Sequence, residues 1–218
     1  YMIQTLNIHK RIYGPDHPKV ASALINLAKA YGSMDTDKAE RCHRRALAIR
    51  ERALGPDHPD VAAVLENLGE FYRTQGRYAK AEPYLTRALE IRERTLGPDC
   101  EEVADVLQTL AALCAARSQY SKQAPLLERL ISIREKLPMR EADKLAVAQH
   151  QQTLAYLYQK TGLPGAWEPL LKRSLETKEK ILGPDHPDVA KALSNLAVIY
   201  QNSGRYSEAE PIYKRAVA

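Results

Sequence analysis

A nine-residue segment that recurs along the chain constrains its fold more than any other feature. LGPDHPDVA occupies residues 54–62 and, unchanged, 182–190, and two close copies are YGPDHPKVA at 13–21 and LGPDCEEVA at 96–104. The glycines of the four copies, Gly14, Gly55, Gly97 and Gly183, are 41, 42 and 86 residues apart. The last interval therefore holds two periods, and a fixed period of this length indicates an array of stacked repeats.

Each period contains two helical patterns. Within residues 61–76, Val61, Val64, Leu65 and Leu68 recur at spacings of three and four, which places them on one helical face, and residues 77–96 repeat this pattern. Small residues recur where two such helices would approach closely: Ala28, Gly69, Ala111, Ala155 and Ala197 in the first helix, and Ala39, Ala81 and Ala209 in the second. Each period is predicted to be a helical hairpin.

The recurring segment reads as the hinge between hairpins. Its Gly follows the last apolar residue of a helix, where a left-handed backbone favours Gly, and its second Pro suits the first position of the next helix. His17, His58 and His186 fall at the N-cap position, although Asp16, Asp57 and Asp185 could cap instead. A row of metal-binding or acid–base Asp–His pairs is the functional alternative. Metal ligands must converge on one point, whereas repeats place these pairs on successive layers, so no metal site is expected.

Two segments carry a family resemblance. NLGEFYRTQGRYAKAEPYLTRAL (67–89) and NLAVIYQNSGRYSEAEPIYKRAV (195–217) resemble tetratricopeptide repeats in their Leu-Gly/Ala, Tyr, Gly, Ala and Ala-Leu positions. The 42-residue period with GPDHPDVA is similar to the long repeats of kinesin light chains and nephrocystin-3. The resemblance implies an all-α fold, a right-handed superhelical solenoid of antiparallel helix pairs.

The repeats predict one solenoid over residues 1–218. We expect a lone second helix at 1–13, followed by repeats at 18–54, 59–96, 101–137, 143–182 and 187–218, the last incomplete. The fourth hinge is replaced by LPMREADKLAV, which begins at Leu137. The partial repeats at both ends predict flanking repeats or other domains in the natural protein.

Charge and cysteine content narrow the class of protein. The 32 Lys and Arg exceed the 27 Asp and Glu, but the signs alternate along the helices, so no nucleic-acid partner is expected. No apolar run approaches the roughly 20 residues that span a bilayer, so no membrane insertion is expected. The three cysteines, Cys42, Cys100 and Cys114, form no Cys-x-x-Cys pair, which favours a reducing compartment and a cytoplasmic location.

Catalytic motifs are missing from the sequence. It contains no Gly-x-x-x-x-Gly-Lys loop, His-Glu-x-x-His or Gly-x-Ser-x-Gly. We therefore expect no enzymatic activity and no cofactor. The prediction is a protein-interaction scaffold or adaptor that binds a protein or peptide partner. Two alternatives stay open: a regulatory or sensor arm of a larger signalling ATPase or kinase, and a structural solenoid that self-associates through its exposed ends.

The resemblance also implies where a peptide would lie, since the first helices of such repeats line a concave groove. Positions that share one face of these helices and avoid the apolar stripe include the predicted peptide-binding residues Asn26, Lys29, Asn67, Glu70, Thr109, Gln149, Thr153, Tyr156, Lys160, Lys191 and Asn195. The same face includes Ser33, Val198 and Asn202. In the family, recurrent Asn side chains hold an extended backbone, which an amide suits because it both donates and accepts. The alternative is that these Asn residues only face solvent.

Three departures from the repeat pattern stand out. Gln123 and Trp167 replace the small residue of the second helix, and His43 replaces the Leu at 85, 127 and 171. Trp167 predicts either local repacking of its hairpin or a pocket wall for an apolar side chain of a partner. His43 predicts a partly buried contact between repeats. The polar run QHQQ (149–152) fits a specialised binding segment or a decayed repeat.

Overall fold

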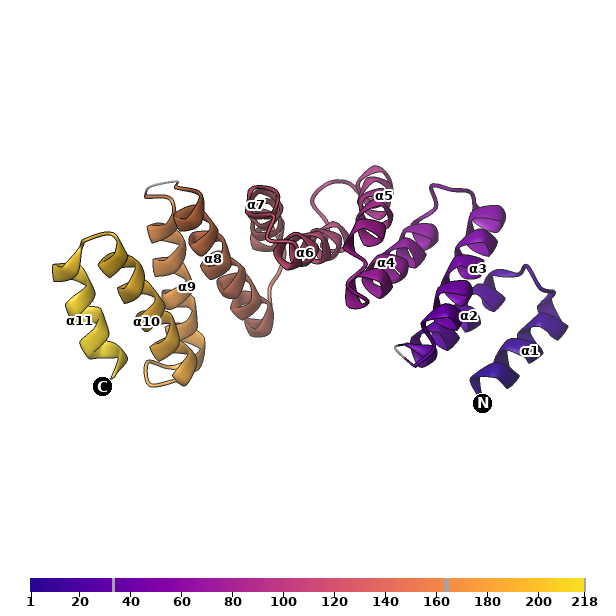
Figure 1. Ribbon diagram of the computed structural model, residues 1–218, viewed down its shortest axis with the longest axis horizontal. Coiled ribbons are helices and arrows are strands. Elements are labelled where there is room, and N and C mark those ends of the chain that lie inside the picture. The colour runs from indigo at the N-terminus through magenta and orange to yellow at the C-terminus, as the bar shows by residue number, and fades with distance from the viewer. Residues whose placement is uncertain (33, 163–164, 218) are drawn as a thin grey trace. The chain divides into compact units, whose positions relative to one another are not determined.

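The chain folds into helices alone over the part described by the computed structural model. Residues 1–32, 34–162 and 165–217 are described, and within them the chain forms eleven α-helices and no strand (Figure 1). The expected all-α architecture is confirmed. One position predicted from sequence to lie on the groove face, Ser33, lies outside the described residues. The helices divide into two compact units, Tyr1–Gln119 and Tyr120–Ala218.

The first unit contains six helices that lie side by side in chain order (Figure 1). They are α1 (Met2–Tyr13), α2 (Pro18–Tyr31), α3 (Thr36–Leu54), α4 (Pro59–Thr74), α5 (Tyr78–Leu96) and α6 (Glu101–Ala116). Helices α2 and α3 form one hairpin and α4 and α5 the next. Part of the core is a cluster in which Leu24 and Leu27 of α2 are buried with Ile49 of α3 and Val64 of α4.

The second unit contains α7 (Tyr120–Lys136), α8 (Glu141–Thr161), α9 (Trp167–Leu182), α10 (Pro187–Asn202) and α11 (Tyr206–Ala216). Helices α8 and α9 form one hairpin and α10 and α11 another. Helix α8 begins two residues before the expected start at 143, because the backbone N–H of Arg140 donates to Asp143 Oδ2 at 3.1 Å. The organisation of residues 1–218 as one uninterrupted solenoid stays a prediction.

Each hinge ends one helix and begins the next. Gly14, Gly55, Gly97 and Gly183 have φ of 86–88° with ψ of 156–164°. The positive φ was expected, but the extended ψ places these residues outside the left-handed helical region, in a region that is essentially restricted to Gly. The next helix starts on His, since Nδ1 of His58 accepts from the Asp60 N–H at 3.1 Å, with equivalent bonds at His17 and His186.

The alternative caps have other partners. Asp16 accepts from Arg52 at 3.0 Å, and Asp57 pairs with Arg94 at 2.8 Å. These ion pairs lie on the outside of the hinge and hold the aspartates away from the helix starts. The His side chain therefore caps the helix through Nδ1.

Ion pairs link three second helices to the repeat that follows, each through the Glu at the corresponding position. Arg77 donates to Glu40 at 2.7 Å, Arg117 donates to Glu82, and Arg205 donates to Glu168 at 2.5 Å. Arg205, with help from Lys172, lowers the pKa of Glu168 to about 2. Some of the charged side chains that alternate in sign along the helices therefore form ion pairs between neighbouring hairpins and do not simply face solvent.

Trp167 lies in the core of the second unit. Its side chain is 6% exposed, and its ring meets the ring of Tyr200 edge-on with 5.5 Å between centroids. It packs with Leu171 of its own helix and Val189 and Leu196 of α10. The local-repacking interpretation is therefore correct. The pocket-wall interpretation is wrong, because the indole is covered by the chain's own side chains.

His43 is buried more completely than expected. The residue is 3% exposed, its ring lies 5.5 Å from that of Phe71 on α4, and Nδ1 has no hydrogen-bond partner. Burial, with a smaller effect from Lys29, lowers the pKa of His43 to about 4. The ring is therefore neutral in the folded protein at pH 7.

We expect His43 to make the first unit sensitive to mild acid. The pKa of histidine in an unfolded chain is 6.5, so the unfolded chain binds a proton at His43 below that pH. The folded chain binds this proton only near pH 4. The contribution of His43 is present above pH 6.5 and should fall by about 2 kcal/mol between pH 8 and pH 5. Urea unfolding at both pH values should show a smaller loss of stability for His43→Leu than for the parent. Equal losses would contradict the assignment.

Gly69 is needed for the approach of α4 and α5. A Cβ added there would lie 2.5 Å from Leu85 Cγ, and both residues are fully buried. Gly69→Ala should lower the free energy of unfolding by about 1–2 kcal/mol, although Ala favours a helix more than Gly does. In a Leu85→Ala background the same substitution should be neutral or stabilising. Additive effects of the two substitutions, measured by urea unfolding, would exclude this contact as the cause.

Candidate groove in the second unit

A groove of about 660 Å³ opens between the first helices of the last two hairpins. Most of its wall comes from α8 and α10, and Leu171 of α9 contributes to its floor. The lining residues are Gln149, Gln152, Thr153, Tyr156, Gln159, Lys160, Leu171, Asn195, Val198, Ile199 and Asn202. Five of the predicted binding residues, Gln149, Thr153, Tyr156, Lys160 and Asn195, are thus brought together on one surface.

The groove combines exposed apolar side chains with amides. Tyr156 on α8 is 46% exposed and Val198 on α10 is 43% exposed, so both remain open to a ligand. Five of the lining side chains are amides, Gln149, Gln152, Gln159, Asn195 and Asn202. Amides can both donate to and accept from an extended backbone, while the apolar residues can cover a side chain. The surface therefore has what an extended peptide requires.

The two remaining polar groups of the α8 wall are held by their own helix. Thr153 Oγ1 donates to the Gln149 carbonyl at 3.1 Å, and the Lys160 ammonium lies 5.4 Å from the centroid of the Tyr156 ring. The Lys160 ammonium therefore lies over the ring of Tyr156, and its positive charge stays beside the groove. Of the eleven described residues that line the groove, none carries a carboxylate.

A buried lysine lies behind the groove wall. Lys178 of α9 is 8% exposed, and its Nζ donates to Oε1 of Gln152 at 2.9 Å. Burial lowers the pKa of Lys178; Asp188 raises it and Lys191 lowers it further. Lys191, a predicted binding residue, is exposed one turn before Asn195 on α10 and does not line the groove.

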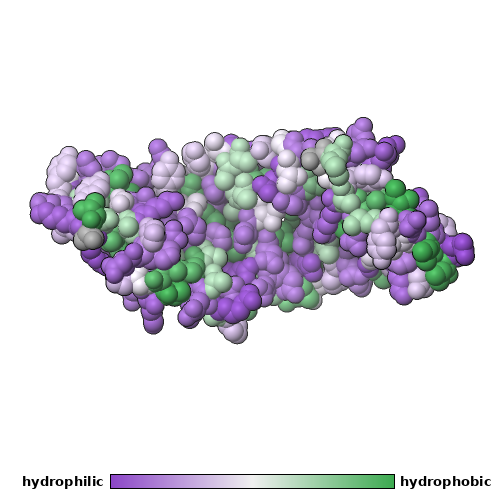
Figure 2. Space-filling view, turned by 90° about the horizontal axis from the view of Figure 1, so that it is seen from below, coloured by the Kyte–Doolittle hydropathy of each residue, from purple (hydrophilic) through white to green (hydrophobic). Residues whose placement is uncertain are grey.

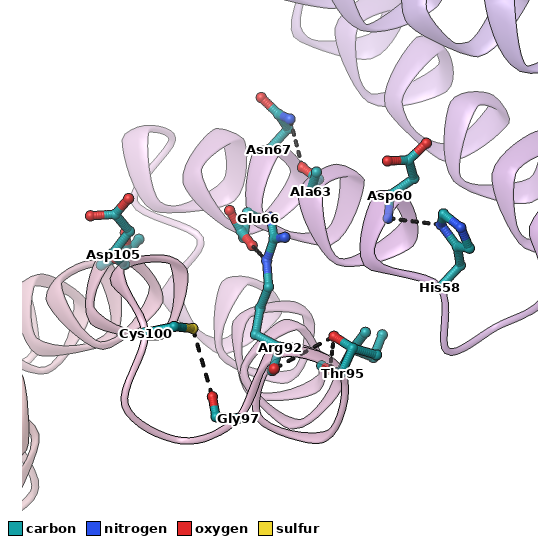
Figure 3. Close-up of polar contacts among 12 residues, drawn as sticks. His58, Asp60, Ala63, Glu66, Asn67, Arg92, Thr95, Gly97, Cys100 and Asp105 are labelled. Carbon is teal, nitrogen blue, oxygen red and sulfur yellow. Dashed lines mark hydrogen bonds and ion pairs between the residues drawn. The ribbon is translucent and has the colours of Figure 1, made fainter. Parts of the chain in front are cut away.

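The predicted binding residues of the first unit are more fully engaged within their own helices. Asn67 Nδ2 donates to the Ala63 carbonyl at 2.6 Å, as Figure 3 shows. Both oxygens of Glu70 accept from Arg73, at 2.6 and 2.7 Å, and Thr109 Oγ1 donates to the Asp105 carbonyl at 3.1 Å.

Asn26 and Lys29, on α2, are exposed. They share that helix face and belong to the first unit, whereas the residues of the α8–α10 groove belong to the second. The role of the first-unit residues in binding stays a prediction.

Sequence reasoning missed four lining residues, Gln152, Gln159, Leu171 and Ile199. Gln152 belongs to the QHQQ run, whose unusual polarity was the available signal. Leu171 and Ile199 are buried members of the apolar stripes, and only the spacing of the assembled helices shows that their edges reach the groove floor.

The described residues also bear on metal binding and on membrane insertion. Among the described residues, no three His, Cys, Asp or Glu side chains come together in a way that could hold a metal ion. Within the same ranges, no helix has both the length and the apolar character needed to cross a bilayer.

Comparison with known proteins agrees with this architecture. A family model described as tetratricopeptide repeat matches residues 1–52, 32–93, 60–136 and 144–218. A search of curated protein sequences gives no match.

Solved structures with a similar fold include the nearly identical TPR-like repeats of a candidate kinesin light chain from Podosopora anserina, at 24% identity and TM-score 0.74, covering 92% of this chain and 94% of that one. BtubC (BKLC) from P. vanneervenii is 20% identical with TM-score 0.73, covering 99% and 85%. YrrB, described as a TPR protein with an unusual peptide-binding site, is 16% identical with TM-score 0.63, covering 100% and 92%.

The likeness to these structures, all below 25% identity, supports the fold alone. The family assignment rests on the repeat model, whose matches extend over most of the chain. This chain belongs to the tetratricopeptide repeat family.

Proposed function

We propose that this protein is a non-catalytic interaction scaffold whose groove between α8 and α10 holds an extended segment of a partner protein. The observation that carries the proposal is the coincidence, in one groove, of two exposed apolar residues with five amides. Isolated apolar residues are ordinary on a protein surface. Tyr156 and Val198, however, lie in a concave surface beside amide side chains that can donate and accept hydrogen bonds.

Helical rigidity favours this use of the groove. Its walls are formed by α8 and α10, whose buried faces are anchored in the same unit by residues such as Leu154 and Leu196. A preformed surface loses little conformational entropy when it binds, so a short segment can gain affinity from few contacts. YrrB, a structural neighbour of the same family, is described as having a peptide-binding site, which makes a similar use of this fold reasonable.

The chemistry of the site argues for binding over catalysis. The lining residues are amides, a threonine, a lysine and apolar groups, with no carboxylate, histidine or cysteine to act as a base or nucleophile. Cys42, Cys100 and Cys114 form no disulfide bond, and the proposed cytoplasmic location is consistent with this.

Self-association is a second candidate, favoured by one observation on α1. Ile3, Ile8 and Ile12 are 54%, 55% and 65% exposed. Figure 2 shows hydrophobic atoms in green at the end of the molecule where α1 lies. Sedimentation velocity over a range of concentrations should show association that Ile8→Lys weakens, if this face binds a second copy. A monomer at every concentration would exclude it. A role as the regulatory arm of a larger signalling protein stays a prediction.

Peptide selection against the whole chain tests the groove. Peptides enriched from a library of extended twelve-residue sequences should bind Tyr156→Ala about 10-fold more weakly, because a central aromatic contact of an interface contributes 1–2 kcal/mol or more. Tyr206→Ala, on the exposed surface of α11, is the matched control and should bind as the parent does. Fluorescence anisotropy measures both affinities.

Two asparagines refine the same test. Asn195→Ala should weaken the selected peptides more than Asn67→Ala, because the Asn67 amide already donates to its own helix. Peptides that bind Tyr156→Ala and Asn195→Ala as tightly as the parent would show that the groove is not the binding site. Circular dichroism should confirm that each variant keeps its helical content.

A further inference from the structure

The ammonium of Lys178 is buried without an opposite charge as its hydrogen-bond partner. It is 8% exposed, and its Nζ donates to a neutral group, Oε1 of Gln152, at 2.9 Å. Buried charges in proteins are normally paired with opposite charges, because desolvation is costly. Asp188 on α10 is the carboxylate whose charge acts on Lys178, but its side chain is 62% exposed and 3.9 Å from His186 Nδ1.

The same position two periods earlier contains the expected ion pair. Glu66 and Arg92 each precede Gln152 and Lys178 by 86 residues. Figure 3 shows Arg92 of α5 reaching Glu66 of α4, with 2.9 Å between Arg92 Nε and Glu66 Oε1. The charges cancel in that hairpin. In the hairpin of α8 and α9 the carboxylate is replaced by an amide of almost the same shape, so the positive charge remains.

Gln152 connects this unbalanced charge to the groove. It lines the groove, whereas Lys178 lies behind it. Because Lys178 donates to Oε1, the amide is oriented as an acceptor toward the lysine and keeps its two N–H groups as donors for a ligand. A nearby cation polarises such an amide and strengthens the hydrogen bonds that its N–H groups donate.

We propose that Gln152 and Lys178 make the α8–α10 groove selective for a segment that places an Asp or Glu carboxylate against Gln152. The inference rests on the proposed peptide-binding function and adds the chemistry of the bound residue. Gln152 contacts the carboxylate, and Lys178 is a positioning residue that orients the amide and supplies charge. Lys160 on the groove wall adds a second positive charge, and the lining has no carboxylate to repel the ligand.

Two matched peptide libraries test this assignment. Both contain extended twelve-residue segments with one fixed central position, Glu in one library and Gln in the other, and both are bound to the whole chain. We expect the Glu library to bind about 10-fold more tightly in aggregate, since a carboxylate interacts more favourably than an amide with a partly desolvated cation.

Gln152→Glu is the decisive variant. It reproduces the Glu66–Arg92 arrangement, so it should fold with an internal ion pair and lose the preference for Glu over Gln. Lys178→Met removes the charge by a second route and should also abolish the preference. Glu66→Gln, the reciprocal change in the first unit, is the control and should leave the preference unchanged.

The outcomes separate the two proposals. Equal binding of both libraries by the parent chain would overturn the carboxylate selectivity and leave the peptide-binding function standing. A preference for Glu that survives in both Gln152→Glu and Lys178→Met would also overturn it, because other residues would then recognise the peptide carboxylate. If neither library bound the parent chain, the groove function itself would be overturned, and the selectivity with it.

Discussion

The structure depends on a backbone constraint at the hinge between hairpins. At Gly14, Gly55, Gly97 and Gly183 the chain has a positive φ with an extended ψ, a combination that side chains with a Cβ avoid. In three of the four copies a His three residues after the Gly then accepts the first backbone N–H of the next helix. Ending one helix and starting the next within four residues fixes the register, so corresponding side chains recur on corresponding faces.

That register explains both stability and the candidate site. Positions that face a neighbouring helix hold small residues or, at Trp167 and His43, larger rings that the surrounding residues accommodate. Positions between repeats hold Glu–Arg pairs such as Glu40–Arg77 and Glu168–Arg205. Where Gln152 stands at the position of Glu66, the local charge balance differs while the helical hairpin is kept. Functional variation can therefore arise on this scaffold from single substitutions at fixed positions.

Much of this architecture could be predicted from sequence. Periodicity predicted helical hairpins, and the structure has them at α2 and α3, α4 and α5, α8 and α9, and α10 and α11. The start of α8 was placed two residues too late, where the hinge is lost, and the His caps were one of two alternatives that the sequence offered. The conformation at Gly14 was only half predicted, because sequence indicates the need for Gly but not its ψ. The burial of Trp167 and His43 depends on how neighbouring repeats pack, which local patterns do not encode.

The candidate site was harder to predict than the fold. Five residues of the predicted first-helix face, Gln149, Thr153, Tyr156, Lys160 and Asn195, line one groove, and their role in binding stays a prediction. The same reasoning gave Asn67 equal weight, because sequence does not show that its amide bonds to its own helix. It also overlooked Gln152, whose significance appears only when Lys178 is seen behind it.

The proposed binding site lies between α8 and α10. NMR spectra of the side-chain amides of the whole chain, recorded as a selected peptide is added, test this placement directly. We predict that the amide signals of Gln149, Gln152 and Asn195 shift together and saturate with the peptide, while that of Asn67 shifts least. Saturable shifts that leave these three signals unchanged and appear only in residues outside the groove would contradict it.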